Sequence, residues 1–369
     1  MRLRPSFQPR TMVLWVVMLL ATCATVAAQT SIWHPVQVPF PQRAGNLLAA
    51  IDADSPTDVW AVGLSALHFD GNTWTPLAIR GTGVTLNGVT VISAADVWGA
   101  GEFQDQGGIV HPSLQHFDGT RWVSVASFDP GAGLSLSAID AISSTDVWAA
   151  GWIVDVACDC IQDFVEHWNG SKWVALSVPF LSGSHFLQGI VARSSSDIWV
   201  VGYQSLNGEL DGQAETMHWN GTAWSVVTVQ SAPRSRFNAV AAFAANDVWA
   251  IGITNQTTLA QHWDGASWKT VSTPSTSDVN NNLFGMAGIA SNNLWAVGQH
   301  YSDSASIKPL ILHWDGTQWT LSNAPLVGKS DTLFDAVGFA SGEVWLAGTW
   351  INNKLPIFKP LILFTNQGQ

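Results

Sequence analysis

The chain has 369 residues, of which 47% are hydrophobic and only 11% charged, and its formal net charge at pH 7 is −12. Soluble globular domains usually contain about 25% charged residues, so this surface must be built mainly from Ser, Thr, Asn, Gln and Gly. The acidic balance excludes electrostatic tracking of nucleic acid or of an anionic membrane, and we therefore expect no nucleic-acid partner.

The first 28 residues have the pattern of an export signal. Three arginines precede the apolar run "MVLWVVMLLA", and "VAA" (Val26–Ala28) offers small residues for cleavage before Gln29. The apolar run is too short for a typical membrane span. We therefore expect a signal peptide over 1–28 and a mature protein that is secreted or extracytoplasmic, with no stable membrane span. An uncleaved anchor and a lipoprotein, suggested by "LATC" (Leu20–Cys23), are the alternatives.

Beyond the signal, one motif recurs seven times, beginning with "SPTDVWAVG" (Ser55–Gly63). Its tryptophans are mostly about 50 residues apart: Trp60, Trp98, Trp148, Trp199, Trp249, Trp295 and Trp345. A large apolar residue stands ten positions before the residue that begins each DVW-like triplet: Leu48, Leu86, Leu136, Leu187, Phe237, Leu283 and Leu333. The first six copies are followed by a second motif such as "HWDGASW", whose histidines are His68, His116, His167, His218, His262 and His313.

Each unit contains four short β-like segments and no helical periodicity. The first starts at the apolar residue, the second is the DVWAVG segment, the third ends at the histidine motif and the fourth begins at its second tryptophan. Asp-Gly or Asn-Gly between the last two predicts a type I′ hairpin. Four antiparallel strands per 50 residues, repeated seven times, predict an all-β fold, a seven-bladed β-propeller.

The two ends of the repeat array complement each other. "SIWHPVQVPF" (Ser31–Phe40) resembles a fourth strand with nothing before it, and the last unit ends at "PLILFTNQGQ" (Pro360–Gln369) without a fourth strand. We therefore expect Trp33 to lie alongside Leu361–Phe364 and to close the ring. A closed ring has no terminal repeat that needs a cap. Residues 29–369 should form a single domain, and we expect a monomer.

The repeated residues have structural explanations. Two tryptophans per unit should fill the wedges between blades, since each buried indole removes about 150–250 Å² from water. Histidines at the same place in each blade are spread around the ring, so they cannot bind one common ion. Each should instead make a hydrogen bond within its own blade. The aspartates of the DVW triplets should cap turns. We expect no metal and no cofactor.

These motifs resemble those of bacterial exported seven-bladed propellers that carry "S-x-x-D-V-W-A-V-G … L-x-H-W-D-G-x-x-W" units. The resemblance covers Ser31 to about Gln369. Such proteins are similar, at a distance, to kelch, BNR (Asp-box) and photosystem-assembly-factor propellers. The Asp abuts the Gly here, unlike in an Asp box, and the paired glycines of kelch blades are missing.

After signal removal only two cysteines remain, Cys158 and Cys160 in "ACDC". A C-x-C pair in an exported protein can close a small disulfide or bind a soft metal. We favour a disulfide that staples one loop.

Ligand-binding residues should lie where the blades differ. The loops between second and third strands and the crossings between blades share one face of the disc, and ligands usually meet variable loops. Three groups are candidates: residues on the crossings, residues on the longer loops, and residues one position after the apolar anchor, at the channel mouth. The candidate ligand-binding residues are Arg43, Arg80, Asn87, His185, Gln188, Tyr203, Arg234, Arg236, Asn238, Asp278, Tyr301 and Lys329.

Two functions fit this pattern. We favour a non-catalytic binding or assembly propeller that presents its loop face to a protein or glycan, because no convergent acid–base set is visible. The alternative is a propeller glycoside hydrolase or lyase, sialidase-like at the extreme. That reaction needs an arginine cluster and carboxylates about 5–10 Å apart. Arg43, Arg80 and Arg234 or Arg236 would have to converge, with Tyr203 and Glu209 nearby.

Overall fold

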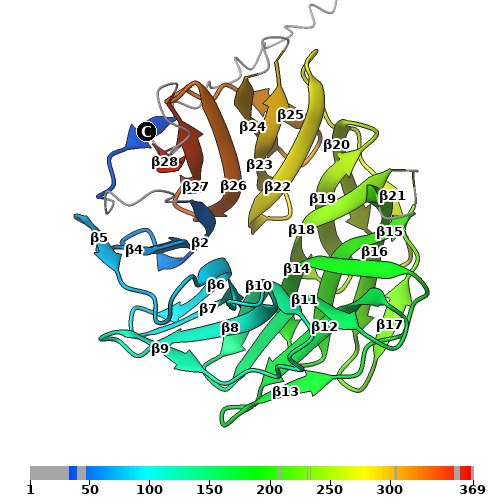
Figure 1. Cartoon of the computed structure of the whole chain (residues 1–369). Helices are drawn as coiled ribbons and strands as arrows, with labels where there is room; N and C mark the ends of the chain where they lie inside the picture. Colours follow the sequence, from blue (N-terminus) through cyan, green and yellow to red (C-terminus); the bar gives the residue numbers. More distant parts are fainter. Residues whose placement is uncertain are drawn as a thin grey trace, which may run out of the picture. The chain divides into compact units, whose positions relative to one another are not determined.

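The computed structural model describes residues 33–39, 47–206, 209–230, 232, 234–302, 306–352 and 358–366, all within one unit, Ser31–Gln369. Over these residues the chain forms 28 β-strands and no helix. The strands make seven four-stranded antiparallel sheets arranged as a ring of blades (Figure 1). In the described part of the chain there is no helix of the length and apolarity that a membrane crossing requires.

The first four blades follow one another along the chain, each with its first strand nearest the axis. Blade 1 comprises β2 (Leu48–Ser55), β3 (Asp58–Gly63), β4 (Ala66–Phe69) and β5 (Trp74–Leu77). Blade 2 comprises β6 (Thr85–Ser93), β7 (Asp96–Gln104), β8 (Val110–Phe117) and β9 (Trp122–Val125). Blade 3 comprises β10 (Leu134–Ser143), β11 (Asp146–Asp155), β12 (Cys160–Trp168) and β13 (Trp173–Leu176). Blade 4 comprises β14 (Ser184–Ser194), β15 (Asp197–Leu206), β16 (Glu209–Trp219) and β17 (Trp224–Val227).

Blades 5 and 6 follow the same order as the first four, whereas blade 7 combines its three C-terminal strands with β1 from the N-terminal part of the chain. Blade 5 comprises β18 (Ser235–Ala244), β19 (Asp247–Thr254), β20 (Thr257–Trp263) and β21 (Trp268–Thr270). Blade 6 comprises β22 (Val279–Ala290), β23 (Asn293–Tyr301), β24 (Ile307–Trp314) and β25 (Trp319–Ser322). Blade 7 comprises β26 (Ser330–Gly338), β27 (Glu343–Ile351), β28 (Phe358–Asn366) and β1 (His34–Val36).

The pairing of β1 with β28 closes the ring as the sequence predicts. The two strands are antiparallel, with His34 opposite Phe364 and Val36 opposite Ile362. Trp33, just before β1, is 5% exposed and its Nε1 donates a hydrogen bond to Ser322 Oγ of blade 6 at 3.0 Å. The first described segment is therefore tied both to the last blade and to the blade before it.

The tryptophans form a closed ring of contacts from each blade to the next. Each second-strand indole meets the outer-strand indole of the following blade edge to face, with ring centroids 5.3–6.3 Å apart. The pairs are Trp60–Trp122, Trp98–Trp173, Trp148–Trp224, Trp199–Trp268, Trp249–Trp319, Trp295–Trp33 and Trp345–Trp74. Such pairs contribute about 0.5–1.5 kcal/mol beyond the area they bury, so the repeated motif encodes the interfaces between blades.

The repeated histidines are structural, as predicted, and form one hydrogen bond within each of six blades. In five blades His Nε2 lies 2.6–2.9 Å from the Asp that begins the second strand, and in blade 6 His313 bonds Asn293. Each imidazole also packs on its blade's second-strand tryptophan, with centroids 4.2–4.6 Å apart. The prediction that these aspartates cap turns was wrong, because they accept hydrogen bonds from the imidazoles and, in three blades, from an indole N–H.

The glycine that ends each DVWAVG segment permits a close approach between two strands. A Cβ placed on Gly63 would lie 2.0 Å from the carbonyl oxygen of Leu47, and the equivalent glycines of the other blades show the same contact at 1.9–2.1 Å. The first strand shifts register at this point, between Leu48 and Ala50 in blade 1. A bulge of this kind bends the strand, and only glycine lets the second strand follow it.

The hairpins between third and fourth strands differ from the predicted type I′ turns. Among the described residues with positive φ, the Asp or Asn of these hairpins does not appear, and only the following glycine is left-handed, as at Gly71 with φ 87°. In blade 1, Asp70 Oδ1 instead accepts hydrogen bonds from the backbone N–H groups of Asn72 and Thr73 at 3.0 and 2.8 Å. The turn is therefore held by the Asp side chain and does not need a left-handed backbone at Asp70. Asp and Asn side chains commonly accept backbone hydrogen bonds in turns in this way.

The tryptophan contacts predict a large stability cost for one truncation. Trp199 is 2% exposed and lies between blades 4 and 5, so Trp199→Ala should lower the free energy of unfolding by about 3–5 kcal/mol. Denaturant unfolding followed by circular dichroism measures this. Val226→Ala, on the outer strand of the same blade and 48% exposed, should change it by less than about 0.5 kcal/mol. Equal effects from the two variants would contradict the assignment.

Candidate functional site

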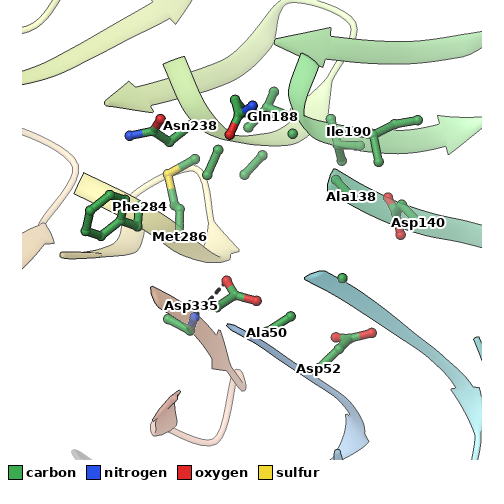
Figure 2. Close-up of a pocket in the computed structure, with 18 of the residues that line it drawn as sticks. Ala50, Asp52, Ala138, Asp140, Gln188, Ile190, Asn238, Phe284, Met286 and Asp335 are labelled. Atoms are coloured by element: carbon green, nitrogen blue, oxygen red, sulfur yellow. Dashed lines mark hydrogen bonds between the residues drawn. The ribbon is translucent and has the colours of Figure 1, made fainter. Parts of the chain in front are cut away.

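The first strands of all seven blades enclose a central channel. A cavity of about 400 Å³ is lined by residues of β2, β6, β10, β14, β18, β22 and β26. Figure 2 shows Gln188 and Asn238 on one side of it and Asp52, Asp140 and Asp335 on others. Of the predicted ligand-binding residues, the structure brings Asn87, Gln188 and Asn238 together here, along with the equivalent Ser137.

Side-chain amides at the channel donate hydrogen bonds to backbone carbonyl oxygens of the neighbouring blade. Asn87 Nδ2 donates to the carbonyl oxygen of Leu136 at 3.0 Å, and Asn238 Nδ2 donates to that of Leu283 at 2.6 Å. Gln188 Nε2 reaches only the carbonyl oxygen of the preceding Leu187, at 3.3 Å. Two of these three residues therefore connect blades 2 to 3 and 5 to 6.

Three channel carboxylates were missed by the sequence analysis. Asp52, Asp140 and Asp335 each accept a backbone N–H from the next blade, from Val91, Ala192 and Ile51 respectively, at 2.7–3.0 Å. Shielding from water by the surrounding blades raises the pKa of Asp52 and Asp335 to about 7 and that of Asp140 to about 6, and the backbone hydrogen bonds offset only part of this. A sequence signal existed, because Asp52 and Asp140 both stand four residues after the apolar anchor.

A second pocket opens among the variable loops of blade 2. Its volume is about 820 Å³, and it lies between the crossing at Arg80–Val84, the loop from β7 to β8 and the crossing that contains Asp129. Gln115, on β8, lines it and is 1% exposed. Its Nε2 lies 3.0–3.1 Å from Arg80 O, Ser113 Oγ and Ser124 Oγ, which share its two N–H groups. Its Oε1 is buried and has no hydrogen-bond partner among the described residues, and the same holds for Gln261 Oε1 at the equivalent position of blade 5.

An ion-paired histidine stands beside this pocket. His111 Nδ1 lies 2.8 Å from Asp129 Oδ2 and its Nε2 lies 3.4 Å from Asp105 Oδ2. The hydrogen bond to Asp129 raises the pKa of His111 above its usual value. Because Asp105 and Asp129 lie on different loops, this histidine ties together the two loops that flank the pocket.

The other predicted residues are spread around the loop face. Arg43 lies outside the described residues. Arg80 is exposed and lines the pocket of blade 2, and Lys329 is exposed on the crossing from blade 6 to blade 7. Asp278 Oδ2 lies 2.8 Å from His300 Nδ1, next to the half-buried Tyr301.

Arg234, Arg236 and Tyr203 are separated from Arg80 by the ring. Arg234 is exposed with φ 57° and Arg236 is half-buried, both at the crossing from blade 4 to blade 5. Tyr203 is 5% exposed and stacks on Phe186 with centroids 5.2 Å apart. Arg80 follows blade 1. The arginine convergence that a sialidase-like site requires is therefore absent for the described arginines of that set.

A buried acidic cluster joins blades 3 and 4. Asp163, His185 and Glu215 are 5%, 3% and 9% exposed, and one potential metal-ligand atom from each lies within 4.8 Å of the others. Burial, with a contribution from the charge of Glu215, raises the pKa of Asp163 well above its usual range. Burial also raises that of Glu215. Burial would lower the pKa of His185, but its hydrogen bond to Glu215 outweighs this and raises it.

The expectation of no metal rested on the six repeated histidines, and none of those belongs to this cluster. His185 was selected only as a crossing residue, and neither carboxylate was selected. The cysteines lie nearby in sequence: Cys158 and Cys160 are disulfide-bonded, with Cα atoms 5.2 Å apart, at the start of the strand that carries Asp163.

The channel carboxylates predict a pH dependence. An aspartate whose pKa is higher in the folded than in the unfolded chain binds more protons when folded, so its contribution to the free energy of unfolding falls as pH rises from about 4 to about 7. In Asp52→Asn and Asp335→Asn, this decline between pH 5 and 7 should be shallower than in the wild type, by at most about 1.4 kcal/mol per pH unit. Urea unfolding at a series of pH values measures the slope.

Asp70→Asn is the control for this slope. Asp70 is exposed in a hairpin, and hydrogen bonds from Thr73 and Asn72 lower its pKa, so its titration lies below the tested interval. A change in hydrogen bonding that accompanies the substitution shifts the free energy of unfolding at every pH and leaves its slope untouched. A channel variant with the wild-type slope would show that the carboxylate is ionised throughout.

Comparisons with known proteins support the fold and name no family. No model of a protein family matches the chain, and no curated protein matches it. Among solved structures, YCF48 bound to D1 peptide is 16% identical with a TM-score of 0.56, covering 90% of this chain and 94% of that one. YCF48 from Cyanidioschyzon merolae is 14% identical with a TM-score of 0.58, covering 90% and 98%. The WD40 β-propeller domain of Doa1 is 10% identical with a TM-score of 0.60, covering 92% and 97%. At these identities the likeness concerns the propeller fold.

Proposed function

We propose that this chain is a non-catalytic, exported binding propeller that takes a protein segment in the loop-face pocket of blade 2. The observation that carries the proposal is the pocket itself, a hollow of about 820 Å³ among the variable loops that is lined by apolar side chains and by amide and hydroxyl groups.

The lining of the pocket supports a peptide ligand. Apolar side chains such as Val84, Phe103 and Leu114 stand next to amide and hydroxyl groups such as Gln104 and Ser124. Ligand sites typically combine an apolar wall with a few placed polar groups. YCF48, a propeller of the same fold, is described as bound to D1 peptide, which supports a peptide ligand for this chain by analogy. We further propose that the chain is a monomer and is distantly related to kelch and Asp-box propellers.

A pocket-filling variant tests this site. Ala126 lines the pocket and is exposed, so Ala126→Trp should fill it without disturbing the core. Peptides selected from a random library on the wild-type chain should lose at least about tenfold in affinity for this variant, a loss of about 1.4 kcal/mol, measured by isothermal titration calorimetry.

The equivalent substitution one blade further is the control. Ser177 stands four residues after Trp173, as Ala126 does after Trp122, and is also exposed. Ser177→Trp should therefore keep the wild-type affinity. Selection of glycans and no peptides on parallel arrays would favour a glycan ligand, the alternative that the sequence left open. Turnover of fluorogenic glycosides would favour the hydrolase alternative.

Export is the second part of the proposal. Its support is the arginine-containing N-terminus, the apolar run and the small residues before Gln29. A disulfide between Cys158 and Cys160 fits an oxidising compartment.

Expression of the full chain in a bacterial host tests the export signal. The exported product should begin at Gln29 by N-terminal sequencing, because cleavage follows "VAA". Val17→Arg interrupts the apolar run and should leave the uncleaved chain in the cytoplasm, whereas Gln8→Ser, outside the run, should be processed normally. A full-length product in both the wild type and Val17→Arg would contradict cleavage.

A further inference from the structure

The cluster of Asp163, His185 and Glu215 lies inside the interface between blades 3 and 4. Asp163 is on β12 of blade 3, and the other two residues are on β14 and β16 of blade 4. Each stands two residues before a member of the apolar core of this interface: Val165, Leu187 and Met217. Because strand side chains alternate between faces, all three polar groups point into the same interface, on the side of the variable loops.

The same three positions are apolar or small at the neighbouring interfaces. Counted from the repeated histidine and the apolar anchor, they are Pro112, Leu134 and Phe164 between blades 2 and 3. Between blades 4 and 5 they are Ala214, Ser235 and Leu259. Between blades 6 and 7 the position of His185 is taken by Asp331, whose carboxylate accepts the backbone N–H groups of Val327 and Gly328, and the other two positions are Pro309 and Leu361. The fold therefore does not require three titratable groups together at these positions. Departures from an otherwise consistent repeat mark functional positions.

The cluster lacks partners for most of its carboxylate oxygens. Among the described residues, both oxygens of Asp163 and Oε1 of Glu215 are buried without a hydrogen-bond partner, and of the four carboxylate oxygens only Glu215 Oε2 has one, His185 Nδ1 at 2.6 Å. Buried carboxylates are normally paired or bound to a metal. A proton shared between Asp163 and Glu215 would satisfy two of these oxygens and leave a third without a partner, whereas one cation would bind an oxygen of each carboxylate together with the imidazole nitrogen.

The histidine is oriented by a carbonyl behind it. His185 Nε2 lies 3.2 Å from the carbonyl oxygen of Ser182, which can accept an Nε2–H. Nδ1 lies 2.6 Å from Glu215 Oε2, a hydrogen bond that needs a proton between the two atoms. A metal ion would replace this proton and bind the Nδ1 lone pair and the carboxylates, because metal ligands must be deprotonated. Metal-binding histidines commonly have their second nitrogen held in this way.

We propose that Asp163, His185 and Glu215 bind one divalent transition-metal ion, best represented by Zn²⁺, which ties blade 3 to blade 4. One imidazole and two carboxylates suit Zn²⁺ or Mn²⁺, while Ca²⁺ and Mg²⁺ prefer oxygen ligands alone. The two cysteines nearby are bonded to each other, so thiolate ligation is not part of the site. The ligands come from both blades, so the ion acts as a clamp under the loop face.

Metal titration of the mature chain tests the proposal. After treatment with chelator and dialysis, calorimetry with ZnCl₂ or MnCl₂ should show one ion per chain, confirmed by elemental analysis after gel filtration. At a free ion concentration about 100-fold above Kd, the ion should raise Tm by roughly 2–5 °C, because it binds the folded chain. Asp163→Asn and His185→Gln should each weaken binding at least about tenfold.

Two further variants keep the test decisive. Glu166→Gln changes a buried carboxylate on the same strand that is already bonded to Ser127 Oγ at 2.7 Å, and it should retain full affinity. The triple variant Asp163→Ala, His185→Ser, Glu215→Leu carries the residues found one blade further. It should fold and bind no ion, since buried charged groups can often be replaced by apolar ones.

Three results would overturn the assignment. They are no binding of Zn²⁺ or Mn²⁺ by the wild type, binding of Ca²⁺ or Mg²⁺ only, and an undiminished site in the folded triple variant. Because the peptide pocket is in blade 2, its failure and the failure of this metal site are independent.

Discussion

The edge-to-face contact between one blade's second-strand tryptophan and the next blade's outer tryptophan is the interaction on which the ring depends. It recurs at all seven interfaces with centroid distances of 5.3–6.3 Å. Blades of a propeller are separate sheets, so no strand-to-strand hydrogen bond of a ladder joins them. Side-chain packing must supply the association, and a large rigid ring does so with little loss of conformational entropy. At the last interface the indole comes from Trp33, which makes ring closure part of the same network.

Polar groups hold these tryptophans in place and add a second layer of contacts nearer the axis. The imidazole of each His-containing blade packs flat on its tryptophan and is bonded to the Asp or Asn at the start of the second strand. At the channel, Asp52, Asp140 and Asp335 accept N–H groups from the next blade. The repeat therefore uses most of its polar residues structurally, which explains why a regular pattern of His and Asp carries no catalytic signal.

Function is better sought where the repeat is broken. The blade 2 pocket lies among loops that vary between blades, and the Asp163–His185–Glu215 cluster occupies strand positions that are apolar or small at the two neighbouring interfaces. The cluster leaves buried oxygen atoms without a hydrogen-bond partner among the described residues. A rigid ring can tolerate such positions because the tryptophan contacts stabilise each interface independently of them. The two sites are proposed to serve different ligands, a peptide and a metal ion.

The sequence alone determined the number of blades, the four strands in each, the closure by the Trp33 segment and the structural role of the histidines. These depend on local periodicity and on residues repeated at fixed spacing, which a single chain displays directly. The hairpin type and the role of the DVW aspartates were misassigned from the sequence. Both depend on which of several nearby groups forms a hydrogen bond with a short side chain, and this is not visible in the sequence. Only the tertiary structure brought Asp163, His185 and Glu215 together. Their spacing in the chain follows no motif, and they meet because two blades, which are separate sheets, pack face to face.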